Sequence, residues 1–68
     1  MTISIQLNGE KHTFEKPMDI ASILNMLNIP VSSVIVEYNR NVLQKANFSN
    51  IRVNNGDVIE LIRIVGGG

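Results

Sequence analysis

Only one segment of this 68-residue chain has the spacing of an amphipathic helix. Behind Asp19, apolar residues recur at intervals of three and four positions, at Ile20, Ile23, Leu24 and Leu27. Such a stripe covers one side of a helix and has to be buried against another element. Because the chain offers no second helix, the stripe must pack against a β-sheet, and a fold of the α+β class is predicted.

The ends of this helix are marked by residues that cap or interrupt helices. Asp19 suits the N-cap position, because its carboxylate can accept a hydrogen bond from a free N–H group of the first turn. Asn28 and Pro30 end the helix at about residue 28, since proline disfavours helical geometry in the residue before it.

Alternation of apolar and polar residues predicts a β-hairpin before the helix. Ile3, Ile5 and Leu7 alternate with polar residues, which is the pattern of a half-buried strand. Asn8-Gly9 follows, a dipeptide that readily adopts the positive φ angles of a tight turn. A hairpin over residues 2–15 is therefore predicted.

Strand signals also fill the second half of the chain. Residues 34–38 are mostly β-branched or aromatic, which favours a strand. Residues 58–65 form a final strand with apolar residues on both faces, which indicates a place in the middle of the sheet. Between them the sequence predicts a turn at 39–41, a short strand at 42–43, a loop at 44–50 pinned by Phe48, a short strand at 51–53 and a turn at 54–57.

These elements fit together as a β-grasp (ubiquitin-like) fold. A hairpin, one helix and a second group of strands share one core only if the helix lies across one face of a mixed sheet of four to five strands. The first and last strands are then neighbours in the middle of the sheet. The helix stripe is expected to be buried against Ile5, Val36 and Leu61. A chain of this length makes one domain, residues 1–68.

Composition argues against several classes of function. The chain has no cysteine, so it has no disulfide, no thiolate nucleophile and no cysteine metal site. Six basic and six acidic residues cancel, whereas nucleic-acid-binding proteins usually carry a basic surplus. No apolar run approaches the ~18–20 residues of a membrane span, and the first residues lack the pattern of a signal peptide. We expect a cytoplasmic protein with no nucleic-acid or membrane partner.

Side chains that could carry chemistry are scattered along the chain. His12 is the only histidine, which rules out sites with two histidines. Ser4, His12 and Asp57 could be combined into a catalytic triad, but no motif supports it and so small a domain offers little cleft. Asp19, Glu37 and Asp57 have simpler roles as a cap, a strand-surface residue and a turn residue. No catalytic residue and no metal site is predicted.

The remaining candidate is the tail Gly66-Gly67-Gly68, which directly follows the last strand. It is not a phosphate-binding loop, because no lysine and no helix follow it. Taken alone, the tail could equally be a frayed terminus. With no side chains to pack, residues 66–68 are expected to be flexible in the free protein.

Residues 54–68 resemble the C-terminal signature of the ThiS family of sulfur carriers, in which a Gly-Asp turn opens the last strand and a Val-Gly-Gly-like tail ends it. Residues 3–9, the predicted helix and the strand at 34–39 also fall where the family has its own, so the resemblance covers essentially the whole chain. Arg40 is a departure, because many members have Asn-Gly in this turn, and arginine makes a two-residue turn less favourable.

The resemblance implies a function for the tail. A ThiF-like adenylyltransferase would use ATP to activate the carboxylate of Gly68, and a sulfur donor system such as a cysteine desulfurase would convert it to a thiocarboxylate. Thiazole synthase (ThiG-like) would then receive the sulfur. Gly66 and Gly67 would carry Gly68 into the partner active sites. The carrier itself would be no enzyme, would bind no cofactor and would be a monomer when free.

The partner-binding surface is expected on the sheet face away from the helix, close to the tail. Arg63 and Val65 are favoured as contacts because they immediately precede the glycines. Three alternatives remain. The small subunit of molybdopterin synthase shares the fold and tail, but often has prolines where this chain has Ile-Arg-Ile-Val at 62–65. A protein-conjugating modifier and a plain β-grasp interaction module with an incidental tail are the other two.

Overall fold

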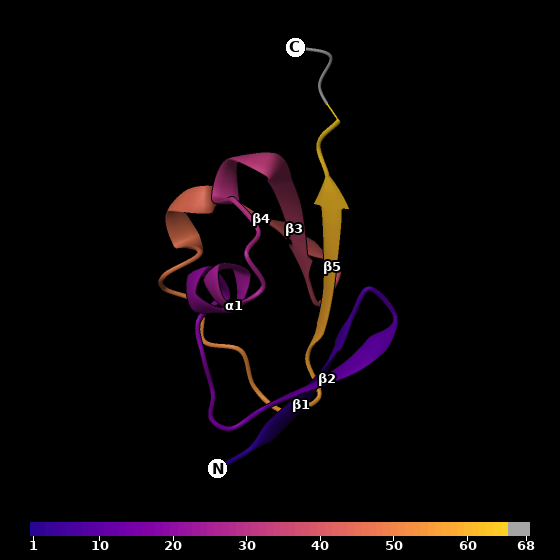
Figure 1. Cartoon of the computed structure of the whole chain (residues 1–68), viewed down its shortest axis with the longest axis vertical. Helices are drawn as coiled ribbons and strands as arrows, with labels where there is room; N and C mark the ends of the chain where they lie inside the picture. The colour runs from indigo at the N-terminus through magenta and orange to yellow at the C-terminus, as the bar shows by residue number, and fades with distance from the viewer. Residues whose placement is uncertain (66–68) are drawn as a thin grey trace.

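The computed structural model describes residues 1–65 as one sheet with a helix beside it (Figure 1). The predicted flexible tail, residues 66–68, lies outside the described residues. The elements are, in chain order, β1 (Ile3–Leu7), β2 (Glu10–Phe14), α1 (Ile20–Met26), the 3-10 helix η1 (Val31–Ser33), β3 (Val34–Tyr38), β4 (Asn41–Leu43), the 3-10 helix η2 (Lys45–Asn47) and β5 (Val58–Arg63).

The sheet has five strands in the order β2-β1-β5-β3-β4. β1 and β5 run parallel, whereas every other neighbouring pair is antiparallel. α1 lies across one face of this mixed sheet, and the chain after β5 continues away from the sheet along the long axis of the molecule, as far as residue 65 (Figure 1). The prediction of a β-grasp fold is confirmed, including the adjacent positions of the first and last strands.

Both hairpins turn through two residues with positive φ angles. In the first, Asn8 and Gly9 have φ angles of 51° and 81°, as the Asn-Gly dipeptide predicted. In the second, Asn39 and Arg40 have φ angles of 48° and 72°, and β4 already begins at Asn41. The expected three-residue turn at 39–41 was therefore wrong. Arginine adopts the left-handed conformation here, in spite of its side chain.

The helix is shorter than its periodicity indicated, because it closes in a Schellman motif. Met26 is its last residue, and Asn28 follows with a φ angle of 59°. The Asn28 N–H donates to the Asn25 carbonyl (3.1 Å) and the Ile29 N–H donates to the Leu24 carbonyl (2.9 Å). These two hydrogen bonds satisfy carbonyls that the end of a helix would otherwise leave free.

The helix starts at the predicted N-cap, Asp19, but the strand predicted at residues 51–53 is not formed beside it. The Asp19 carboxylate accepts a hydrogen bond from the Ser22 N–H at 2.7 Å. This hydrogen bond lowers the pKa of Asp19, and the nearby charge of Arg52 adds to the effect. The short strand expected at 51–53 is absent from the described sheet, because this segment forms only an isolated bridge between Asp19 and Arg52. Val53 is nevertheless fully buried.

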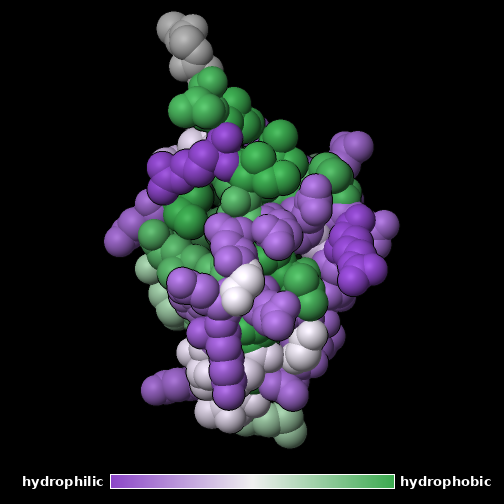
Figure 2. All heavy atoms as spheres, turned by 90° about the vertical axis from the view of Figure 1, so that its right-hand side faces the viewer, coloured by the Kyte–Doolittle hydropathy of each residue, from purple (hydrophilic) through white to green (hydrophobic). Residues whose placement is uncertain are grey.

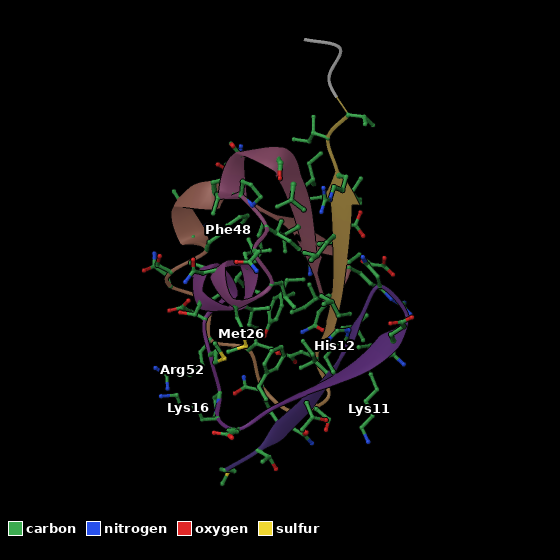
Figure 3. All side chains as sticks on the ribbon, viewed as in Figure 1. Lys11, His12, Lys16, Met26, Phe48 and Arg52 are labelled. Carbon is green, nitrogen blue, oxygen red and sulfur yellow. The ribbon has the colours of Figure 1, made fainter. Side chains whose placement is uncertain are left out.

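The core lies between α1 and the sheet. Ile23 and Leu24 are buried as expected, whereas Leu27 and Leu61 are only partly buried at its margin. Phe48 points from the loop after β4 into the space between helix and sheet, as Figure 3 shows, and so pins this loop. The buried cluster consists of Ile3, Ile5, Leu7, Phe14, Ile20, Ile23, Leu24, Val34, Val36, Phe48, Val53 and Ile59.

Candidate functional site: the open sheet face and the end of the last strand

One face of the sheet carries the helix, and the other, which we call the open face, does not. Side chains on neighbouring strands share a face when their residues are paired in register. Val36 on β3, for example, is paired with Leu61 on β5 and belongs to the covered face. The open face consists of Ser4, Gln6, Lys11, Thr13, Ile35, Glu37, Val42, Val58, Glu60 and Ile62.

The open face divides into a polar and an apolar half. On the hairpin β1–β2 it is polar, and the hydroxyls of Ser4 and Thr13 are hydrogen-bonded to each other at 3.0 Å. Toward the end of β5 it becomes apolar, and Figure 2 shows hydrophobic atoms gathered at that end of the molecule. The apolar patch consists of Ile35, Val42, Ile62 and Ile64, with 40%, 66%, 44% and 47% of their surfaces exposed.

Pairing continues for one residue beyond β5. The Ile64 N–H donates to the Ser33 carbonyl at 2.9 Å, which extends the β3–β5 register past the pair of Val34 and Arg63. By alternation Ile64 then lies on the open face beside Ile62. Ile64 is therefore the last residue of the apolar patch, and only Val65 separates it from the glycine tail in the sequence.

The two residues favoured as partner contacts are exposed but do not belong to this patch. Arg63 alternates with Ile62 and has the parity of Ile59 and Leu61, which puts it on the helix side of the sheet. Val65 follows the strand and is 95% exposed. Their roles as contacts stay predictions. Counting the alternation from a buried residue of the last strand would have identified Ile62 and Ile64 as the open-face residues.

The other end of β5 is held by a network around one carboxylate. Asp57 accepts hydrogen bonds from the Tyr38 hydroxyl, from the Asn39 side-chain amide at 3.3 Å and from the Asn54 N–H at 2.8 Å. Asn39 in turn accepts a hydrogen bond from the Val58 N–H at 2.8 Å. Burial and the contact with Asp57 together raise the pKa of Tyr38 to about 12. The network ties the start of β5 to the β3–β4 turn.

Two more asparagines fasten β1 to the same region. The Asn8 side-chain oxygen accepts a hydrogen bond from the Leu61 N–H at 2.7 Å, and the Asn55 side-chain oxygen accepts one from the Ser4 N–H at 2.7 Å. Side-chain oxygens thus replace backbone partners where the short β1–β5 ladder ends. β5 is therefore held by β1 as well as by β3 as far as Leu61.

The structure separates the three residues that could have formed a triad. Ser4 is on the open face, where its hydroxyl pairs with Thr13. His12 is paired with Ile5, which puts it on the covered face. Asp57 belongs to the turn network. Within residues 1–65, no three histidine, cysteine or acidic side chains gather in a way that could hold a metal ion.

A hollow of about 320 Å³ lies at the margin between β2 and α1. Figure 3 shows Lys16 and Met26 there, at the opposite end of the molecule from the end of β5. Its lining residues are Thr13, Phe14, Glu15, Lys16, Met18 and Met26. The hollow is remote from the tail and takes no part in the candidate site. No helix among the described residues is long and apolar enough to span a bilayer.

Comparison with known proteins agrees with this arrangement. The model of the ThiS family matches residues 5–68, which include all three terminal glycines. The chain belongs to the ThiS family. The sulfur carrier protein ThiS of Bacillus subtilis is 32% identical over 65 residues, which cover 94% of this chain and 98% of that protein.

Two further relatives extend the comparison. The crystal structure of the thiamine biosynthesis protein ThiS from Geobacter metallireducens superimposes with a TM-score of 0.85 at 28% identity, over 97% of this chain and all of that one. A thiazole synthase of Paramagnetospirillum magneticum is 30% identical over 66 residues. That match covers 97% of this chain but only 20% of the relative, so this ThiS-like chain corresponds to a fifth of that thiazole synthase.

Proposed function

We propose that this ThiS-family chain is a sulfur carrier for thiamine biosynthesis and that Gly68 is the residue that carries the sulfur. The observation that supports this most directly is the course of β5. Its start is held in the middle of the sheet, its other end leaves the core, and Val65 is 95% exposed directly before the glycines. The match of the family model through residue 68 adds to it.

The proposed chemistry takes place at the terminal carboxylate. A ThiF-like adenylyltransferase joins the Gly68 carboxylate to the α-phosphate of ATP, and pyrophosphate leaves. A sulfur donor that carries a persulfide, formed by a cysteine desulfurase, then attacks the acyl carbon with its outer sulfur, and AMP leaves with the former carboxylate oxygen. A thiol cleaves the acyl disulfide that results, forms a disulfide with the donor and releases the thiocarboxylate. The resulting thiocarboxylate gives its sulfur to thiazole synthase and becomes a carboxylate again. The chain binds neither ATP nor a metal in this scheme, and its partners catalyse every step.

Glycine suits the last three positions for physical reasons. Without a side chain, the acyl carbon of Gly68 is open to attack, and the backbone can follow a narrow channel in conformations that other residues resist. The cost is conformational entropy, at about 1–2 kcal/mol for each residue that a partner orders. Contacts between the folded domain and the partner have to offset that cost, which is a reason to expect a docking surface near the tail.

The test is to change the length of the tail without touching the fold. One alanine appended after Gly68, or deletion of Gly68, displaces the carboxylate from the position that the partner active site selects. Adenylation should fall by orders of magnitude because reaction rates depend steeply on orientation. ATP-dependent release of pyrophosphate measures activation, and intact mass detects the exchange of one oxygen for sulfur.

The matched control is one alanine added before Met1, which should leave activation unchanged. A melting curve for each variant should show no loss of stability, since every change lies outside residues 1–65, which contain the sheet, the helix and the core. Full activation of the chain extended beyond Gly68, with intact mass showing that no protease has trimmed it, would contradict the sulfur-carrier proposal.

A further inference from the structure

The dipeptide Asn-Gly occurs twice in this chain, at Asn8-Gly9 and at Asn55-Gly56. Asparagine before glycine is prone to lose its side-chain amide, because glycine has no side chain to keep its backbone nitrogen away from the asparagine side chain. Both dipeptides lie in turns and are exposed. They are therefore two candidates for the same chemical modification in different surroundings.

Deamidation begins when the glycine backbone nitrogen attacks the side-chain carbonyl carbon of the asparagine. A C–N bond forms, the bond to the side-chain nitrogen breaks, and ammonia leaves with the hydrogen of the glycine N–H. Water then opens the cyclic imide at either of its carbonyl carbons, and the product is aspartate or isoaspartate. The reaction needs a backbone N–H that a base can reach and a peptide unit that can rotate.

The electrophilic carbonyl group is held alike at the two sites. The Asn8 side-chain oxygen accepts a hydrogen bond from the Leu61 N–H, and the Asn55 side-chain oxygen accepts one from the Ser4 N–H, each at 2.7 Å. A donor on this oxygen stabilises the negative charge that develops during the attack. Because the donor and the distance are the same, this contact does not distinguish the two sites.

The attacking nitrogen is held at only one of the sites. The Gly56 N–H donates to the Ser4 carbonyl at 2.8 Å. In contrast, neither the Gly9 N–H nor the Asn8 carbonyl has a hydrogen-bond partner in the part of the chain that the structure describes. The Asn8–Gly9 peptide unit can therefore rotate and lose its proton without giving up a hydrogen bond of its own.

The turn that contains Asn55 is also closed more tightly. The Asp57 N–H donates to the Asn54 carbonyl at 3.1 Å, and the Asp57 carboxylate accepts a hydrogen bond from the Asn54 N–H at 2.8 Å. The first hairpin turn is closed by the ladder pair of Leu7 and Glu10. Local opening costs more free energy where more hydrogen bonds have to break, so the fold protects the second site.

Asn8 is a sensitive place for such a change, because it fastens β1 to β5 beyond their short ladder (Figure 1). Its N–H donates to the Ile59 carbonyl at 3.0 Å, and its side chain accepts from Leu61. In isoaspartate the carboxylate is attached directly to Cα, so it is too short to keep the contact with Leu61. The main chain also gains a carbon atom within a tight turn.

We propose that Asn8 deamidates in the folded protein, that the fold protects Asn55, and that isoaspartate at position 8 releases β5 from β1 at Leu61. The inference does not depend on the proposed carrier function. Aspartate, the other product, keeps an oxygen at the original reach, so only the isoaspartate form loosens the strand.

The two rates are compared within one sample. The folded chain is incubated in mildly alkaline buffer, and peptide mapping by mass spectrometry follows the exchange of amide for acid at each asparagine. Asn8 should react roughly five- to tenfold faster than Asn55, because the latter has about one more hydrogen bond to break. In denaturant the two rates should become similar, and this control separates protection by the fold from effects of neighbouring residues.

The product is tested separately from the reaction. A chain of 68 residues is short enough for chemical synthesis with isoaspartate at position 8. Its melting temperature should be at least about 4 °C below that of wild type, as expected when a hydrogen bond and a tight turn are lost in a small domain. Its Leu61 N–H should exchange faster with solvent. The matched variant Asn8→Asp should melt and exchange like wild type.

Three outcomes would overturn the inference. Equal rates in the folded chain, or a faster reaction at Asn55, would show that Asn8 is not the favoured site. A rate ratio that persists in denaturant would trace the difference to neighbouring residues and not to the fold. An isoaspartate chain that melts like wild type and protects the Leu61 N–H equally well would show that the modification does not release β5.

Discussion

The two ends of β5 differ in almost every physical property. At its start, Ile59 is buried and the preceding turn is held by the hydrogen bonds of Asp57. At its end, Ile62 and Ile64 are nearly half exposed, and a single backbone hydrogen bond to Ser33 continues the pairing. One strand thus combines a well-anchored start with a partly exposed end.

This difference shows how a small domain can expose the residues that precede its three glycines without losing its fold. Stabilising contacts are concentrated where β5 begins, and the residues that are free to meet another protein follow within one strand length. Substitutions at the start should therefore affect stability, and substitutions at the end should affect function.

The largest effect is expected from truncating the same side chain at each end. Ile59→Ala should lower the free energy of unfolding by about 2–5 kcal/mol, because it leaves a cavity in the core. Ile62→Ala should cost only about 0.2–1 kcal/mol, because that residue is already 44% exposed and loses chiefly its cross-strand pairing with Ile35. Urea denaturation of both variants measures the difference. Similar losses at the two positions would refute the contrast.

Loss of the turn network should have the next largest effect. Asp57→Ala removes the acceptor for Tyr38, Asn39 and Asn54, and should cost about 1–3 kcal/mol in free energy of unfolding. Asp57→Asn retains one side-chain oxygen and should be less damaging. Activation of the tail should persist in any fraction that remains folded. An alanine variant as stable as wild type would show that the network does not anchor β5.

The same network predicts a step in stability at high pH. The pKa of Tyr38 is raised from 10.0 to about 12, so the folded chain holds the phenolic proton more tightly than the unfolded chain. This contribution is fully present below pH 10 and is lost as the pH rises through about 12. Denaturation of wild type and Tyr38→Phe between these values should show the step only in wild type. Parallel curves would argue against it.

The smallest effect, and one of opposite sign, is expected in the β3–β4 turn. Arg40 has a φ angle of 72°, in a region that glycine occupies without a steric penalty. Arg40→Gly should therefore stabilise the domain by up to about 1 kcal/mol. Lys45→Gly, in η2, should give no stabilisation, because that residue is not among those with a positive φ angle. Destabilisation by Arg40→Gly would mean that the arginine side chain itself holds the turn.

Local patterns predicted much of the fold because each depends on a few neighbouring residues. The Asn8-Gly9 turn, the Asp19 cap and the stripe through Ile23 and Leu24 are of this kind, and all are present. The middle position of the last strand also followed from apolar residues on both of its faces. The resemblance to the ThiS family predicted a function for the tail, because no local sequence pattern distinguishes three terminal glycines from a frayed end.

Features that depend on distant residues could not be predicted. The turn at Arg40 tightens because Tyr38 pairs with Asn41 and the Asn39 side chain accepts a hydrogen bond from the Val58 N–H, in another strand. Val53 is buried, but within residues 1–65 its segment forms only an isolated bridge, between Arg52 and Asp19, and no strand. The pairing of Glu37 with Glu60 depends on a register between strands more than twenty residues apart.

The middle position of β5 also has a consequence for how the protein is made. On the ribosome, β1 and β2 can pair early, and β3 and β4 soon after, yet no strand pairing joins the two hairpins until β5 has been synthesised and has left the exit tunnel. The helix stripe has no complete sheet to cover until then. Long-range pairing of this kind slows folding relative to local contacts. A nascent chain that stalls before Val58 should consequently expose its apolar core residues to chaperones and proteases, and the domain becomes compact only once its last strand has been translated.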